Sequence, residues 1–297
     1  MQNFQSIYRS DVESDWCPGC GDFGILSAIT QALGELEIPP WKCAIFSGIG
    51  CSGKTPHFIN AYGIHTLHGR PLPFAIGAKM ANPSLTVIAI SGDGDGYGIG
   101  AGHFVNAGRR NVDITYIVHN NGVYGLTKGQ ASPTLKRGVQ PKSLKYPNLN
   151  DMVNPIALAL ASGYSFVARG FAYNVKHLKE IIKQAVIHKG LALIDVLQPC
   201  PVFNTVDTKE KYMERIKILD GNEFPTTDIK KAFEKALDEE NLWIGIFYKN
   251  PEKQTYEERY SEILSSYPSE CPANLKMSDE KGNPTTDISE VLNNFLC

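Results

Sequence analysis

Short apolar runs alternate with helix-like segments along the first two thirds of the chain. Five runs have the length and the Val/Ile/Leu content of buried strands, at 42–47, 85–91, 112–118, 164–168 and 191–197. Segments with helical spacing lie around them, at 23–36, 72–80, 99–108, 155–162 and 174–188. This alternation predicts an α/β fold, a doubly wound parallel sheet with helices on both faces.

Polar residues that end two neighbouring runs predict a binding site. Gly92-Asp93-Gly94 ends one run and Asn120-Asn121 ends the next. Because strand–helix–strand crossovers are right-handed and parallel, both turns lie at the carboxyl edge of the sheet, where open α/β sheets bind ligands. The Asp93 carboxylate and the Asn121 amide oxygen suit Mg²⁺ that holds a diphosphate. Asp95 is expected to cap the helix that follows the glycine-rich turn.

Charge and composition exclude several classes of protein. The formal net charge is −2, so nothing favours nucleic acid or an anionic membrane as a partner. No apolar run approaches the length of a membrane helix, and no secretory signal is visible at the N-terminus. The seven cysteines are therefore interpreted as reduced thiols used for metal or catalysis, and the sequence predicts a cytoplasmic protein.

Four cysteines lie in turns beside proline or glycine. Cys17 and Cys20 belong to one tight turn, Cys51 follows the first buried strand, and Cys200 lies between two prolines after the last one. Four thiols suit either zinc or an iron–sulfur cluster, and their spacing leaves both open.

Other residues are expected to have structural roles only. Asp22 is positioned to cap the helix that begins at Phe23, and Lys79 is expected on an exposed helix face. Cys43 lies within an apolar strand and is expected in the core. Cys271 and Cys297 lie in polar segments with no partner pattern.

The central motif resembles that of a known family. Gly92-Asp93-Gly94, followed after twenty-five residues (95–119) by Asn120-Asn121, resembles the thiamine diphosphate motif. The surrounding segments resemble the beta subunits of 2-oxoacid:ferredoxin oxidoreductases; they are His103-Phe104, Arg109-Arg110-Asn111, Tyr124-Gly125 and Gly129-Gln130-Ala131-Ser132-Pro133-Thr134. The resemblance covers residues 10–205.

The resemblance implies three cofactors: thiamine diphosphate, Mg²⁺ and a [4Fe–4S] cluster. Mg²⁺ would be held by Asp93, the Asn121 side chain and the Val123 backbone carbonyl. The cluster would lie close to the thiamine ring, on the four cysteines named above. The residues implied for the cofactor site are Gly48, Ile49, Gly50, Cys51, His68, Gly92, Asp93, Gly94, Asp95, Asn121, Val123, Tyr124, Gly125, Leu126 and Thr127.

Candidates for substrate binding and catalysis lie beside this site. His68 precedes a helix N-terminus and is expected near the diphosphate, with His65 a weaker candidate. Lys54 lies three residues past Cys51; it is either a surface lysine or pairs with the distal carboxylate of 2-oxoglutarate. Leu126 would line the apolar side of the same pocket.

The family's reaction is the coenzyme A-dependent oxidative decarboxylation of 2-oxoacids such as pyruvate and 2-oxoglutarate, with electrons passing to ferredoxin. Two alternatives stay open from the residues themselves. One is a thiamine-dependent decarboxylase or carboligase without a redox cluster. The other is an electron-transfer or zinc-stabilised subunit without chemistry of its own.

The expected domains are residues 1–200, which carry the cofactors, and residues 201–297, a C-terminal extension that packs on the core or on a partner. The extension contains one convincing strand, 242–248, too few for a second doubly wound domain. The glutamate that activates the pyrimidine ring is therefore expected from an alpha subunit. The apolar edge around Ile49, Ile99 and Leu126 would be the interface with it.

Overall fold

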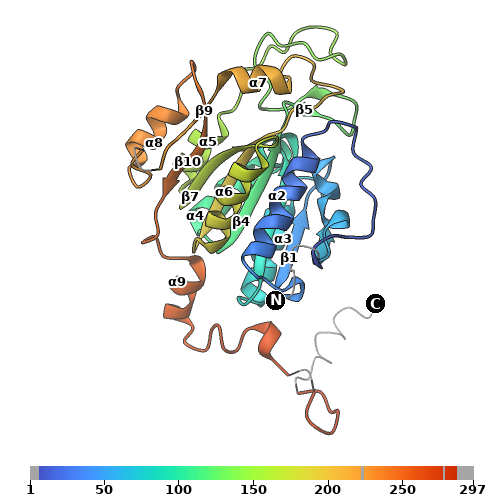
Figure 1. The fold of residues 1–297 in the computed structure, drawn as a ribbon. Coiled ribbons are helices and arrows are strands. Elements are labelled where there is room, and N and C mark those ends of the chain that lie inside the picture. The colour runs from blue at the N-terminus through green and yellow to red at the C-terminus, as the bar shows by residue number, and fades with distance from the viewer. Residues whose placement is uncertain (1–6, 222–223, 277, 286–297) are drawn as a thin grey trace, which may run out of the picture.

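The computed structural model describes residues 7–221, 224–276 and 278–285. Within these ranges eight strands form one sheet in the order β2-β1-β3-β4-β8-β7-β10-β9 (Figure 1). Pairing is parallel from β2 to β7, whereas β10 runs antiparallel to β7 and parallel to β9. The strands are β1 Cys43–Ser47, β2 Tyr62–His65, β3 Thr86–Gly92, β4 Ile114–Asn120, β7 Phe166–Phe171, β8 Leu191–Leu197, β9 Ile216–Ile218 and β10 Leu242–Lys249.

Helices cover both faces of this sheet, which confirms the doubly wound α/β prediction (Figure 1). The face that includes Ile45, Ile88 and Ile117 packs against α2 (Asp22–Glu35) and α6 (Val175–Ile187). The opposite face packs against α3 (Pro71–Ala81), α4 (Ala101–Arg110), α5 (Pro155–Ser162) and α8 (Ile229–Ala236). The remaining short elements are α7 Lys209–Arg215, α9 Tyr256–Ile263, a hairpin of β5 Val123–Tyr124 and β6 Gln130–Ala131, η1 Pro40–Lys42, η2 Ser52–Phe58, η3 Gly94–Ile99 and η4 Pro272–Asn274.

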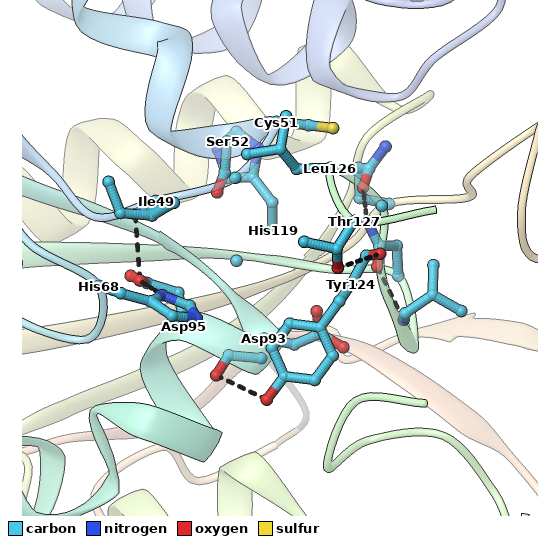
Figure 2. A pocket seen from close by; sticks show the side chains of 17 residues that line it. Ile49, Cys51, Ser52, His68, Asp93, Asp95, His119, Tyr124, Leu126 and Thr127 are labelled. Atoms are coloured by element: carbon cyan, nitrogen blue, oxygen red, sulfur yellow. Dashed lines mark hydrogen bonds and ion pairs between the residues drawn. The ribbon is translucent and has the colours of Figure 1, made fainter. Parts of the chain in front are cut away.

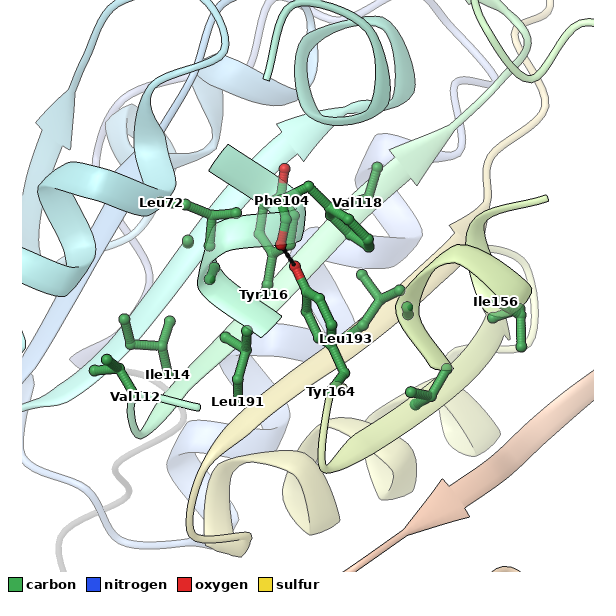
Figure 3. Packing of buried hydrophobic residues seen from close by; sticks show 14 of the residues in the cluster. Leu72, Phe104, Val112, Ile114, Tyr116, Val118, Ile156, Tyr164, Leu191 and Leu193 are labelled. Atoms are coloured by element: carbon green, nitrogen blue, oxygen red, sulfur yellow. Dashed lines mark hydrogen bonds between the residues drawn. The ribbon is translucent and has the colours of Figure 1, made fainter. Parts of the chain in front are cut away.

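Aromatic packing anchors α4 on the second face. The Phe104 ring stacks on the Tyr164 ring with centroids 4.6 Å apart, and the Tyr164 hydroxyl donates to the Phe104 carbonyl at 3.0 Å (Figure 3). Both side chains are fully buried. This packing fixes the position of α4, which follows the glycine-rich turn.

No helix in the described part of the chain has the length and hydrophobicity needed to cross a bilayer.

The five predicted strands are present, with small shifts at their ends. The largest shift is in β7, which begins at Phe166, because the tight turn after α5 includes Tyr164 and Ser165. The helix predicted at 99–108 is present as α4, and a π-helix that was not predicted, η3, precedes it. β2 was not predicted; its four residues are all exposed, so it lacks the apolar pattern of a strand.

The C-terminal part joins the sheet of the core. β10 pairs with β7 across a β-bulge and carries β9 on its far side, so this part extends the sheet. The helices predicted at 228–239 and 255–265 are present as α8 and α9, each with a side-chain N-cap, from Asp228 and Thr255. The division of the chain at residue 200 stays a prediction.

The predictions for Asp22 and Lys79 were wrong. Asp22 does not cap α2: the N-cap residue is Gly21, and the Asp22 side chain is buried against His119. Lys79 is not on an exposed helix face, because its ammonium group pairs with Asp113 at 3.0 Å and the residue is 5% exposed. Cys43 is fully buried as predicted, Cys271 is also buried, and Cys297 lies outside the described residues.

Candidate active site

The glycine-rich turns meet at a cavity of about 130 Å³ at the carboxyl ends of β1, β3 and β4 (Figure 2). Its walls contain every residue predicted for the cofactor except Gly48. Sequence reasoning missed three further lining residues, Ser52, His119 and Gln198. The walls come from both halves of the motif, as the crossover argument predicted.

Two glycines allow the close approach of neighbouring segments around this cavity. A Cβ atom on Gly48 would lie 1.8 Å from an Asp95 carboxylate oxygen, and one on Gly94 would lie 2.2 Å from the Tyr124 ring. Only glycine fits at these two positions, because such contacts are far inside van der Waals distance. Gly48 does not line the cavity, but its lack of a side chain lets the Asp95 carboxylate pack against it.

Asp93 is fixed by hydrogen bonds from the loop that follows β4. Its Oδ2 accepts from the Gly122 amide at 2.9 Å, from the Ser132 hydroxyl at 2.5 Å and from the Thr134 hydroxyl. Burial raises the pKa of the Asp93 carboxyl, and these hydrogen bonds oppose that rise. The contact with Gly122 confirms that Gly92-Asp93-Gly94 lies beside Asn120-Asn121.

A buried hydrogen-bond chain continues from Thr134 away from the cavity. The Thr134 hydroxyl lies 2.8 Å from Asn120 Oδ1, and Asn120 donates to Asp195 at 3.0 Å. Asp195 also accepts from Tyr97 and from Arg169 Nε, each at 3.0 Å. Because every member is partnered, this chain can hold Asp93 in one orientation.

Asp95 ties three loops together and does not cap the following helix, so that prediction was wrong. The residue is 2% exposed and accepts hydrogen bonds from the Ile49 amide at 3.1 Å, the Gly69 amide at 2.7 Å and the Ser91 hydroxyl at 2.6 Å. His68 Nδ1 lies 2.5 Å from the same carboxylate (Figure 2). Asp95 therefore positions His68 on the cavity wall.

The oxygen atoms beside Asp93 fit a hard divalent cation. Asn121 Oδ1 accepts from the Val123 amide at 2.9 Å, and Asn121 Nδ2 donates to Gln198 Oε1 at 2.8 Å. These bonds hold the Asn121 side chain at the cavity. A carboxylate, an amide oxygen and a backbone carbonyl form the donor set that Mg²⁺ prefers, with phosphate oxygens and water completing it.

His119 is the most informative residue that sequence reasoning missed. Its Nδ1 donates to Asp22 Oδ1 at 2.7 Å, both residues are 1% exposed, and its Nε2 has no partner in the described residues. The available signal was a histidine near the end of a buried strand, directly before Asn120-Asn121. His119 also lines the cavity, so a bound ligand can supply the partner that Nε2 lacks.

The four predicted ligand cysteines are free thiols. Burial raises the pKa of Cys51 to about 11, with further contributions from Asp22, Cys200 and Cys17 that also raise it. Burial likewise raises the pKa of Cys20, which Asp22 and Cys200 raise further. No group of three or more His, Cys, Asp or Glu side chains arranged to hold a metal is found in the described residues, so the cluster stays a prediction.

The structure separates the substrate candidates. His68 and Leu126 line the cavity, and Leu126 is 52% exposed at its rim. Lys54 is not among the lining residues; its ammonium group pairs with Asp15 at 2.7 Å near the surface. His65 is also outside the cavity walls, with Nδ1 2.9 Å from the Ser47 hydroxyl. The substrate roles of Lys54 and Leu126 stay predictions.

Comparisons with known proteins agree with this geometry. Residues 48–196 match the family model described as thiamine pyrophosphate enzyme, C-terminal TPP binding domain. Residues 200–264 match a second model, which describes the C-terminal part of the pyruvate ferredoxin oxidoreductase beta subunit.

Three relatives illustrate the similarity. The chain is 60% identical to the 2-oxoacid:ferredoxin oxidoreductase subunit beta of Saccharolobus solfataricus, over 94% of this chain and 95% of the relative. It is 34% identical to the 2-oxoglutarate synthase subunit KorB of Methanocaldococcus jannaschii, over 86% and 94%. It also resembles the solved 2-oxoglutarate:ferredoxin oxidoreductase from Magnetococcus marinus with 2-oxoglutarate, coenzyme A and succinyl-CoA bound, with a TM-score of 0.87 and 35% identity over 99% of this chain and 96% of that one. The chain therefore belongs to the family of 2-oxoacid:ferredoxin oxidoreductase beta subunits, which are subunits of oxidoreductases and contain a thiamine pyrophosphate-binding domain.

Proposed function

We propose that this chain is the cofactor-carrying subunit of an enzyme that oxidatively decarboxylates 2-oxoacids with coenzyme A and passes the electrons to ferredoxin. The observation that carries the proposal is the position of Cys51. Its loop forms part of the same cavity wall as Asp93 and Asn121. A redox group held by this thiol would therefore lie next to a diphosphate cofactor. Neither alternative interpretation requires a redox group and a diphosphate cofactor side by side.

The residues of the cavity fit thiamine diphosphate with Mg²⁺. Asp93, the Asn121 side chain and the Val123 carbonyl would hold the metal, and the backbone of the glycine-rich turns can approach the phosphates. When bound, thiamine diphosphate supplies the carbon nucleophile and the electron sink for decarboxylation. The chain's own contribution is to orient this group, through the fixed Asp93 carboxylate, and to present His68 and Leu126 beside it.

The cysteines fit a [4Fe–4S] cluster by their chemistry, since all four are free thiols and Cys51 lines the cavity. Cys17, Cys20, Cys51 and Cys200 would hold the cluster, which would supply single-electron transfer towards ferredoxin. Reduced thiols of this kind also agree with the expected cytoplasmic location.

An alpha subunit would complete the active site. No glutamate is among the described residues that line the cavity, so the acid that activates the pyrimidine ring is proposed to come from this partner. Ile99 is 57% exposed and Leu126 is 52% exposed, and Ile49, which lines the same cavity as Leu126, is half-buried. Covering this edge with a partner would remove exposed apolar surface.

Purification with and without the alpha subunit tests the proposal. The pair should be brown, contain thiamine diphosphate and reduce ferredoxin when a 2-oxoacid and coenzyme A are added. The isolated chain should not decarboxylate any 2-oxoacid. A colourless pair with bound thiamine would favour a non-redox decarboxylase or carboligase, and a pair without thiamine would favour the electron-transfer or zinc-stabilised subunit. Turnover by the isolated chain would contradict the partner argument.

A further inference from the structure

Gln198 lies between two of the proposed cofactor sites. It directly follows β8, is 1% exposed, and lines the cavity at Asp93. Its Oε1 accepts a hydrogen bond from Asn121 Nδ2 at 2.8 Å, and its Nε2 donates to Cys20 Sγ at 3.1 Å. One side-chain amide therefore joins a proposed Mg²⁺ ligand to a proposed cluster ligand.

The surrounding chain packs closely on this side chain. The Gln198 backbone N–H donates to the Asn120 carbonyl at 2.8 Å, which fixes the point from which the side chain extends. A Cβ atom on Gly21, the residue after Cys20, would lie 2.9 Å from Gln198 Cγ. The glycine therefore allows the turn that carries Cys20 to approach the Gln198 side chain.

A backbone donor determines which end of the amide faces the sulfur. The Val123 N–H donates to Asn121 Oδ1 at 2.9 Å, so Asn121 presents Nδ2 to Gln198. Gln198 accepts that bond with Oε1, which leaves the Nε2 hydrogens for Cys20 Sγ and, at 3.4 Å, for the Pro199 carbonyl. A 180° rotation of either amide would place a donor against a donor. An N–H group therefore points at Sγ.

The surroundings of the Cys20 sulfur disfavour negative charge. Burial and the neighbouring Asp22 carboxylate raise the pKa of the Cys20 thiol, and the Asp22 backbone amide opposes that rise. In the described part of the chain, Gln198 is the only side chain that donates to the sulfur of any of the four proposed ligands. Hydrogen bonds to the ligand sulfurs are one of the factors that set the reduction potential of an iron–sulfur cluster.

We propose that Gln198 is a positioning residue that raises the reduction potential of the cluster through its N–H···S hydrogen bond to Cys20. The inference rests on the proposed function, because it requires a cluster on Cys20. A reduced cluster carries one more negative charge than an oxidised one, so a donor at the sulfur stabilises the reduced form more. Gln198 would thereby favour the uptake of single electrons on the side of the cluster that faces Asn121.

The test is the midpoint potential of the cluster, measured by potentiometry with EPR detection on the purified complex of this chain and its alpha subunit. Gln198→Met keeps the length of the side chain and removes the amide. It should lower the equilibrium constant for one-electron reduction about tenfold, a fall of about 59 mV, because one charge-assisted hydrogen bond is lost. The iron content and the visible absorbance should remain, since all four cysteines are unchanged.

Tyr173→Phe is the matched control. The Tyr173 hydroxyl donates to the Gly19 carbonyl, in the same turn as Cys20, and it does not contact a sulfur. Tyr173→Phe therefore removes one hydrogen bond to this turn but none to a cluster ligand. It should leave the midpoint potential unchanged, which separates the N–H···S contact from a general loosening of the turn.

The outcomes distinguish this inference from the proposed function. A brown complex whose midpoint potential is unchanged or higher in Gln198→Met would overturn the inference and leave the proposed function intact. Equal shifts in Gln198→Met and Tyr173→Phe would also overturn it, because the effect would then come from the turn. A wild-type complex without iron would overturn the cluster assignment and this inference together.

Discussion

Asp22 and His119, 97 residues apart in the sequence, form a buried hydrogen bond of 2.7 Å at the floor of the candidate active site. The bond joins the start of α2 to the end of β4, one position before Asn120-Asn121. It thereby links the segment that carries Cys20 to the segment that carries Asn121. Asp22 Oδ2 and His119 Nε2 have no partner in the described residues, so neither side chain has an alternative that could replace this bond.

Removal of the Asp22 carboxylate should destabilise the fold. Asp22→Ala leaves a buried His119 N–H without an acceptor, which costs about 1–3 kcal/mol in the free energy of unfolding. Asp22→Asn keeps an acceptor oxygen and should lose less. Urea unfolding of the three proteins measures the difference. An Asp22→Ala protein as stable as the wild type would contradict the importance of the bond.

The cysteine assignment can be separated from a general effect on stability. Cys200→Ser should bleach the visible absorbance of the complex and stop ferredoxin reduction, because it removes one proposed cluster ligand. Cys43→Ser should keep the absorbance and change mainly stability, since Cys43 is fully buried in β1. Iron content and the visible spectrum are the measurements. A full iron count in Cys200→Ser would refute the ligand set.

Lys54 can still determine substrate preference, because its exposed ion pair with Asp15 contributes little and can be given up for a substrate carboxylate. Loss of one partner of a buried charge pair costs about 2–5 kcal/mol, whereas one methylene in an apolar pocket changes binding by about 1–3 kcal/mol. Lys54→Ile should therefore reduce 2-oxoglutarate turnover much more than pyruvate turnover.

Asp15→Ala is the matched control for this comparison. It breaks the same ion pair but keeps the lysine, so it should leave the preference between the two substrates unchanged. Equal losses of 2-oxoglutarate and pyruvate turnover in Lys54→Ile would assign Lys54 to the surface only.

Acid should weaken the fold through His188. The residue is 4% exposed, its Nε2 lies 2.7 Å from the Ser165 hydroxyl, and burial together with Lys249 lowers its pKa from 6.5 to about 4. Because the folded state binds this proton less tightly than the unfolded state, the stability it contributes is complete above pH 6.5. That stability should be lost as the pH falls from 6.5 towards 4, by about 2–3 kcal/mol.

Denaturant unfolding at several pH values measures this loss. His188→Gln keeps a polar group near Ser165 but does not titrate, so its stability should fall less over the same interval. The same pH dependence in His188→Gln and in the wild type would show that other groups, such as the half-buried His177, cause the loss.

Local sequence patterns determined much of the core. The strand at Leu191–Leu197 and the helix at Pro155–Ser162 have the predicted bounds, because a buried apolar run and a proline-to-glycine helix frame are local signals. The meeting of Asp93 with the Asn120-Asn121 loop was also predictable. It follows from the handedness of a single crossover, which leaves the two turns at one edge.

Tertiary structure decided the roles of polar residues whose partners are far away in the chain. Asp22 and Asp95 each resembled a helix cap, yet one pairs with His119 and the other joins three loops. β2 forms only because β1 offers it an edge, and β10 turns antiparallel at the other edge of the core. A polar side chain is compatible with many partners, and only packing selects one. Local patterns therefore specify the five core strands and the Gly92-Asp93-Gly94 motif, while packing between distant segments specifies the edge strands and the partners of these polar residues.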